Sequence, residues 1–171
     1  MSTVMQIRAR SLGRELLKGA IAGAVATWTM GMVTSLLYEQ QSSRSRRQEK
    51  RVRRGRSTSG MMAQKAAALV GGELDREERE RLGTMIQWGL GIGAGALYAG
   101  LREQLRKEDG SHGIALGAGF WGIIDEGLNP ALGLKPGPDR FPWQAHLRGL
   151  AGHVSYGVVT DGTLRILDRF F

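Results

Sequence analysis

The sequence predicts an all-α fold, an integral membrane bundle of about four Gly-rich transmembrane helices plus a short cytosolic helix. Two stretches of twenty residues carry no charged side chain, one between Lys18 and Glu39 and the other between Arg81 and Arg102. At 1.5 Å per residue each stretch reaches ~30 Å, the thickness of the hydrocarbon core of a bilayer. Glycine supplies 26 of the 171 residues and recurs within these apolar stretches.

The first part of the chain is expected to contain one span and a long polar connection. Residues 1–14 form a basic N-terminal lead-in, and the first span follows at about 15–39. This apolar run is longer than that of a signal peptide, so it is expected to be retained. Residues 40–81 are predicted to be a flexible, basic loop followed by a soluble helix, which Gly71 and Gly72 interrupt.

Three further spans are expected at about 82–102, 111–129 and 143–167. Pro130 is expected to disturb or end the third of them, because proline lacks the backbone N–H that a helix interior uses. A Pro-rich segment joins the third and fourth spans. Together the four spans make one transmembrane domain, residues 15–171.

Small residues recur at spacing four inside the predicted spans. In lipid no hydrophobic effect drives helices together, so small residues that let two backbones approach supply the packing. In a soluble helix each glycine costs about 1 kcal/mol relative to alanine, which favours the membrane interpretation. The pairs are Gly19 with Gly23, Gly89 with Gly93, Gly91 with Gly95, Gly113 with Gly117, and Ala118 with Gly122.

The net charge of +8 is concentrated in the predicted loop. The positive-inside rule places this loop and the Pro-rich segment in the cytoplasm of a bacterium and both termini outside the inner membrane. The loop is a topology determinant or a binding site for anionic lipid headgroups, at ~1 kcal/mol per basic residue. No aromatic residue is interleaved for base stacking, so nucleic acid is not an expected partner. The basic residues are Arg44, Arg46, Arg47, Lys50, Arg51, Arg53, Arg54 and Arg56.

Ionisable residues within the third and fourth spans form a candidate intramembrane polar site. Such residues are costly in a bilayer and therefore mark functional or structural contacts. His153 is expected at the same depth as a carboxylate of the third span, with His146 one level closer to the Pro-rich segment. One hypothesis is a proton or ion site; the other is a polar clamp between the two spans. The site comprises Asp125, Glu126, His146, His153 and Asp161.

No motif of an enzyme or of a cofactor site is present in the sequence. The chain has no Cys, which excludes disulfides and thiolate metal sites. No Ser/His/Asp spacing, phosphate-binding loop or zinc signature occurs, and three or four metal ligands cannot be assembled from the polar site. The sequence therefore predicts a protein that is not an enzyme and that holds neither a metal nor a cofactor.

The second half of the chain resembles the YagU-like family of bacterial inner-membrane proteins of unknown function. The resemblance covers residues 60–167, and residues 15–38 more loosely, while the basic run 43–57 is particular to this chain. It implies an inner-membrane, multi-helix bundle without an assigned reaction. A His associated with the start of the second span in that family is Gln87 here. The motif residues are Asp125, Glu126, Pro130, Gly133, Leu134, Pro138, Pro142, His146, His153, Tyr156, Gly157 and Asp161.

Two functions are therefore expected. The first is a non-enzymatic structural or assembly component that packs through its Gly faces, with a second copy or another membrane protein as partner. The alternative is a small transporter or a proton- or ion-conducting protein that uses a buried His–carboxylate pair.

Overall fold

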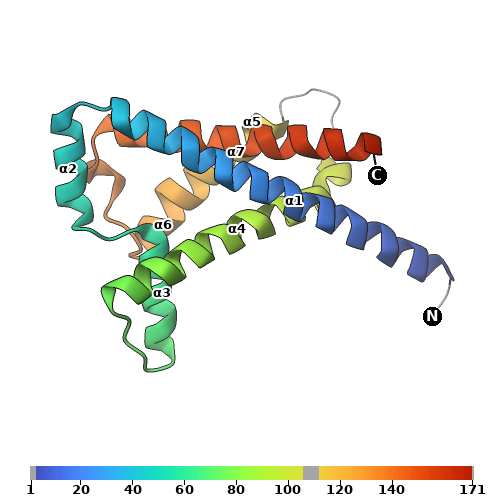
Figure 1. Ribbon diagram of the computed structural model, residues 1–171, viewed down its shortest axis with the longest axis horizontal. Helices are drawn as coiled ribbons and strands as arrows, with labels where there is room; N and C mark the ends of the chain where they lie inside the picture. The colour runs from blue at the N-terminus through green and yellow to red at the C-terminus, as the bar shows by residue number, and fades with distance from the viewer. Residues whose placement is uncertain (1–2, 106–111, 171) are drawn as a thin grey trace.

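Four long helices dominate the computed structural model, which describes residues 3–105 and 112–170. Each lies where the sequence predicts a span (Figure 1). In the described part of the chain every regular element is helical, which confirms the all-α prediction. The long helices are α1 (Thr3–Gln40), α4 (Arg76–Leu105), α5 (His112–Gly119) with its continuation η1 (Phe120–Leu128), and α7 (Trp143–Phe170).

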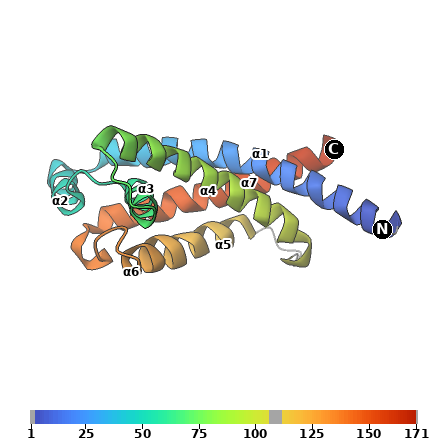
Figure 2. The same cartoon turned by 90° about the horizontal axis from the view of Figure 1, so that it is seen from below.

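The long helices pack as a row of neighbours in which α1 contacts α4 and α7, and α5 contacts α7. Both chain termini lie at one end of the bundle, and the short helices lie at the other (Figures 1 and 2). We call these the terminal end and the capped end. The sequence predicted that the basic segment and the Pro-rich segment would lie on the same side, and both lie at the capped end.

The basic segment is helical, so the prediction of a flexible loop is wrong for residues 43–53. Helix α2 (Ser43–Arg53) begins after Ser42, whose side chain accepts a hydrogen bond from the backbone N–H of Ser45. It ends at Arg54, which has a left-handed φ of 51° and is followed by Gly55. Sequence pattern alone missed this helix because its stabilising contacts come from α7, as described below.

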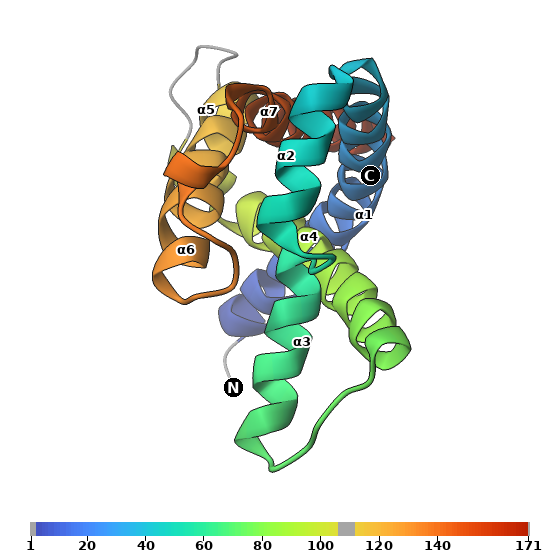
Figure 3. The ribbon, with the colours of Figure 1, turned by 90° about the vertical axis from the view of Figure 1, so that its left-hand side faces the viewer.

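The soluble helix predicted before the second span divides in two. Helix α3 (Thr58–Leu69) ends at the Gly71–Gly72 turn, as expected. The residues after this turn belong instead to α4, which begins with a reciprocal cap: the Glu78 N–H donates to Asp75 and the Asp75 N–H donates to Glu78. Seen from the capped end, α2 and α3 run across the ends of the long helices (Figure 3).

The third long helix changes its winding before Pro130. Residues Phe120–Leu128 form a π-helix, in which the Asn129 N–H reaches back to the carbonyl oxygen of Ile124. A short α6 (Asn129–Ala131) follows and contains Pro130, so the helix ends just after the proline. The Pro-rich segment, residues 135–142, then carries one 3-10 turn, η2 (Pro138–Arg140), before α7 starts.

Glycines set the closest approaches between the long helices. A Cβ atom added at Gly23 would lie 2.5 Å from the carbonyl oxygen of Gly91 in α4, and one added at Gly19 would collide with that of Gly95. A Cβ atom added at Gly113 of α5 would lie 2.7 Å from the carbonyl oxygen of Gly157 in α7. The backbones can approach this closely only because these positions lack side chains.

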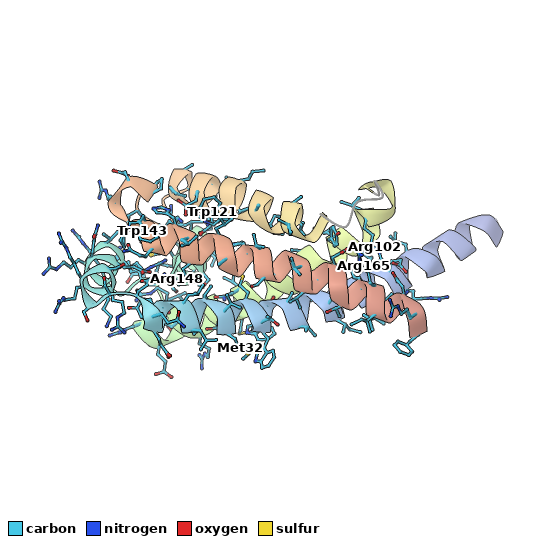
Figure 4. All side chains as sticks on the ribbon, turned by 90° about the horizontal axis from the view of Figure 1, so that it is seen from above. Met32, Arg102, Trp121, Trp143, Arg148 and Arg165 are labelled. Atoms are coloured by element: carbon cyan, nitrogen blue, oxygen red, sulfur yellow. The ribbon has the colours of Figure 1, made fainter. Side chains whose placement is uncertain are left out.

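Apolar side chains are distributed in the reverse of the usual soluble pattern. Among the residues that the structure describes, four of the nine buried hydrophobic residues are alanines, and the largest fully buried side chains are Leu164 and Thr160. Large apolar side chains instead project outward from all four long helices, as Met32 does from α1 (Figure 4). They include Leu17, Ile21, Val25, Trp28, Leu36, Met85, Leu90, Leu97, Leu101, Ile114, Ile123, Leu147, Val158 and Ile166.

One helix in the described part of the chain, Leu12–Gln40, is both long enough and apolar enough to cross a membrane. Length and composition alone do not distinguish such a helix from a signal sequence near an N-terminus or from a core helix of a soluble protein. The other long helices contain charged residues and many glycines, which lower their mean hydropathy. The prediction of four membrane spans therefore stays a prediction.

Candidate functional site

The candidate site lies at the capped end, where η1, the Pro-rich segment and α7 meet. Asp125 and Glu126 lie on consecutive positions of the π-helix η1. Lys135 lies between them, with its Nζ 3.1 Å from Oδ1 of Asp125 and 3.2 Å from Oε1 of Glu126. The Lys135 side chain is only 7% exposed, so its ammonium group depends on these two carboxylates. The structure thus adds a buried cation to the predicted site.

His146 completes this cluster. Its Nδ1 lies 2.9 Å from Oε2 of Glu126, and its Nε2 lies 3.0 Å from the carbonyl oxygen of Pro138. A neutral imidazole carries one N–H and can donate to only one of these two acceptors. Both contacts are satisfied when the ring is an imidazolium, or when Glu126 is protonated and donates to Nδ1. In either arrangement a hydrogen bond joins Nδ1 of His146 to Oε2 of Glu126.

His153 pairs with no carboxylate of the residues that the structure describes, so the contact predicted between His153 and Asp125 or Glu126 is wrong. Its Nδ1 donates to the carbonyl oxygen of Gly149, one turn earlier on α7, at 2.9 Å. Asp161 also lies elsewhere: its Oδ1 accepts from the Tyr98 hydroxyl at 3.0 Å and its Oδ2 pairs with Arg165 at 2.8 Å. Of the five predicted residues, the structure brings three together.

A second ionic cluster fixes α2 against α7. Arg148 binds Glu49 with both Nη atoms, at 3.0 and 2.6 Å, and Arg53 Nε adds a third contact to Glu49 at 2.8 Å. Glu49 is buried, and the Arg148 guanidinium also stacks 5.0 Å from the ring centre of Tyr38. The one carboxylate within the basic segment is therefore the residue that holds it in place.

The pKa of Glu49 follows from the same contacts. Burial alone would raise it, but the hydrogen bonds from Arg148 and Arg53 outweigh burial, so the pKa lies below its ordinary value of 4.5. Glu49 therefore stays ionised to a lower pH than an ordinary glutamate, and its ion pair with α7 is intact at neutral pH.

The basic side chains predicted to bind lipid headgroups all lie on α2 and the turn after it. Arg46 and Arg53 are half-buried, while Arg44, Arg47, Lys50, Arg51, Arg54 and Arg56 are exposed.

A third cluster, at the terminal end, was not predicted. Lys18 lies 3.0 Å from Asp168 and 3.2 Å from Glu15, and Arg102 lies 2.6 Å from Asp168 and 3.1 Å from Glu15. Figure 4 shows Arg102 near this end and Arg148 near the other. These four residues connect α1, α4 and α7. Lys18 and Arg102 each border an uncharged stretch, and this is the sequence feature that could have indicated the two cations of the cluster.

No group of three or more His, Asp or Glu residues suited to a metal ion occurs within residues 3–105 and 112–170 as far as the structure describes them. The ionic clusters pair carboxylates with Lys, Arg and His instead, so the chemistry of the candidate site is that of ion pairs.

Comparison with known proteins gives no relative. No family model matches the chain, and no match was found among curated proteins or solved structures. The resemblance to YagU-like proteins is therefore a proposal.

Proposed function

We propose that this chain is a non-enzymatic, multi-pass protein of a bacterial cytoplasmic membrane and is related to the YagU-like proteins. In this proposal the cap of α2 and α3 lies against the cytoplasmic headgroup layer. The observation that carries this proposal is the reversed distribution of apolar side chains. Leu90 is 56% exposed and Leu97 64%, whereas Gly19 and Ala22 are buried. In water such outward faces would cost free energy along every long helix; in lipid they are solvated.

The charges support the same orientation. The side chains of the capped end include the eight basic residues of the segment 44–56, and an excess of Lys and Arg is typical of the cytoplasmic side. At the terminal end the two cations and two carboxylates of the third cluster compensate one another. The concentration of eight basic residues within 44–56 therefore supports a cytoplasmic position for the cap.

Assembly through glycine faces is supported at positions that the bundle leaves open. Most glycines of the predicted pairs already contact a neighbouring long helix of the same chain. Gly89 and Gly93 of α4 differ, because an added Cβ atom at either would meet nothing within 4 Å. We propose this face of α4 as the contact with a second copy or with another membrane protein.

Single cysteines introduced into this Cys-free chain test the span proposal. We expect Arg47→Cys and Asp139→Cys to react with a membrane-impermeant thiol reagent only after the inner membrane is opened, and Arg169→Cys to react in intact spheroplasts. Leu90→Cys and Val25→Cys should resist the reagent in both conditions, although both side chains are exposed in the structure. Rapid labelling of Leu90→Cys in native membranes would contradict the proposal, because water would then reach the outer face of α4.

The second candidate function is proton or ion handling at the cluster of Lys135, Asp125, Glu126 and His146. The 2.9 Å contact between Nδ1 of His146 and Oε2 of Glu126 favours it, because a proton can be transferred along such a hydrogen bond. The same contacts also connect η1, the Pro-rich segment and α7. These contacts support the polar clamp expected from the sequence, with His146 in place of His153.

Proton flux into liposomes separates these two roles. We expect Glu126→Gln to lower the unfolding midpoint of the protein, because Lys135 and His146 lose a partner, and to leave proton flux at the level of wild-type liposomes. His153→Gln, on the same helix as His146 but outside the cluster, is the control and should affect stability less. A flux that is well above that of empty liposomes and that Glu126→Gln abolishes would establish the second candidate instead.

A further inference from the structure

A cavity of about 530 Å³ opens at the capped end between the C-terminal half of α2 and the segment after α6. Its walls come from residues far apart in the sequence, because Glu49 holds α2 on α7 and Gln48 donates to the carbonyl oxygen of Arg140. This volume suits a small molecule or a headgroup. Figure 3 shows the capped end from outside, with α2 beside the segment that follows α6.

The cavity is lined by six cationic side chains and by no acidic one. Arg51, Arg54, Arg56 and Arg140 have no ion pair or side-chain hydrogen bond to any residue that the structure describes. Gathering such charges without a counterion costs free energy by mutual repulsion. The cavity therefore has a strong electrostatic preference for an anion. The six are Arg51, Arg53, Arg54, Arg56, Lys135 and Arg140.

Two of the six cations are held in place by other contacts. Arg53 is fixed through its Nε by Glu49, and its guanidinium lies 5.2 Å from the ring centre of Phe141. Lys135 is fixed by Asp125 and Glu126, and its ammonium lies 5.7 Å from the centre of the same ring. Positions fixed before binding reduce the conformational entropy lost when a ligand arrives.

The chemistry of these groups indicates which anion fits. Guanidinium groups donate paired N–H groups that match two oxygens of a phosphate, and an ammonium group adds a point charge. Apolar side chains, including Val52 and Leu134, complete the wall and suit the carbon part of a phosphate ester. We propose that this cavity is a binding site for the phosphate group of a phosphate ester, whether a phospholipid headgroup or a soluble molecule. The lipid source rests on the proposed function, because it requires the capped end to face the headgroup layer; the soluble source does not.

The test uses the full chain in a non-ionic detergent, which contains no phosphate. Phosphatidylglycerol added to the micelles is the lipid probe, sn-glycerol 3-phosphate is the soluble probe, and diacylglycerol is the control lipid without phosphate. We expect at least one phosphate probe, and not diacylglycerol, to raise the unfolding midpoint in a saturable manner. Arg51→Gln with Arg140→Gln should raise the apparent Kd at least ~10-fold, since two charge-assisted contacts are lost.

A matched pair of substitutions separates a specific site from general charge. Arg44→Gln with Arg47→Gln removes the same charge from exposed positions of α2 outside the cavity, and should change Kd less than ~2-fold. Arg51→Lys with Arg140→Lys keeps the charge without the paired donors, and should bind between wild type and the Gln pair. Stabilisation by the lipid probe alone assigns a headgroup; stabilisation by glycerol phosphate assigns a soluble ester. Equal losses in the two Gln pairs, or no response to either phosphate probe, would overturn the site without affecting the span proposal.

Discussion

Gly95→Val is expected to separate α1 from α4 and to destabilise the protein by about 3 kcal/mol. An added Cβ atom at Gly95 would collide with the carbonyl oxygen of Gly19 and lie 2.6 Å from the Cα atom of Gly23. These neighbours are backbone atoms of a buried helix face, so no flexible side chain can move aside. The free energy of unfolding in detergent micelles, followed by circular dichroism, measures the effect.

Gly93→Val is the matched control for this substitution. Gly93 lies two residues earlier on the same helix, and an added Cβ atom there meets nothing within 4 Å. The free energy of unfolding of the Gly93→Val variant should stay within about 0.5 kcal/mol of the wild-type value, apart from the small change in helix propensity. Equal destabilisation by the two variants would show that the close approach of α1 and α4 does not limit stability. Loss of self-association in Gly93→Val alone would support the open glycine face as an assembly contact.

The long helices could be predicted from the sequence because their signal is local. Each of the two uncharged runs is as long as the hydrocarbon core of a bilayer is thick, and these two runs predicted much of α1 and most of α4. The small-residue pairs Gly19–Gly23 and Gly91–Gly95 were also visible in the sequence. Their contact with each other was not, since spacing four gives a face on one helix and does not identify the helix that packs on it.

The details of the candidate site depend on rotation between helices, which the sequence does not specify. His146 and His153 lie on one face of α7 at different depths, and depth alone favoured His153. The contacts of Gly113 and Gly157 fix how α5 and α7 face each other, and in that arrangement Glu126 reaches His146. Lys135 comes from a Pro-rich segment without periodicity, so no pattern could have placed it between two carboxylates.

Helix α2 was missed for a related reason. A segment with eight basic residues has strong internal repulsion, which favours an extended, solvated chain. The one acidic residue in its middle, Glu49, accepts from Arg53 on α2 and from Arg148, 99 residues later in the chain. Local helix propensity does not include the contribution of an ion pair with a residue so distant in the sequence.

Glu49→Gln is therefore expected to release α2 from the bundle. The substitution keeps the size of the side chain and removes the charge that Arg148 and Arg53 share. Two guanidinium groups then face each other near a buried amide, and breaking a buried ion pair on one side costs about 3–5 kcal/mol. Because α2 is rich in trypsin sites, local opening can be measured as cleavage within residues 44–56, which should become at least ~100-fold faster.

Glu39→Gln makes the same chemical change at an exposed position before α2 and should leave cleavage unchanged. In the double variant Glu49→Gln/Arg148→Met the effects should be strongly non-additive, since the second substitution removes the charge that the first leaves unpaired. Additive effects would show that the two side chains do not act as a pair.

The same ion pair predicts a dependence of stability on pH. Because the pKa of Glu49 is lower in the folded chain than its ordinary value of 4.5, the unfolded chain binds the proton more readily. The stabilisation by Glu49 is therefore complete above this ordinary value and is lost as pH falls through the lowered one. The difference in unfolding free energy between wild type and Glu49→Gln should be constant from about pH 7 to pH 5 and shrink below about pH 4. A difference that stays constant down to pH 3 would mean that the carboxylate charge does not hold α2. Phosphate binding by Glu49→Gln and by wild type, both measured at pH 7 so that the charge of the phosphate stays the same, gives an independent check of the same contact.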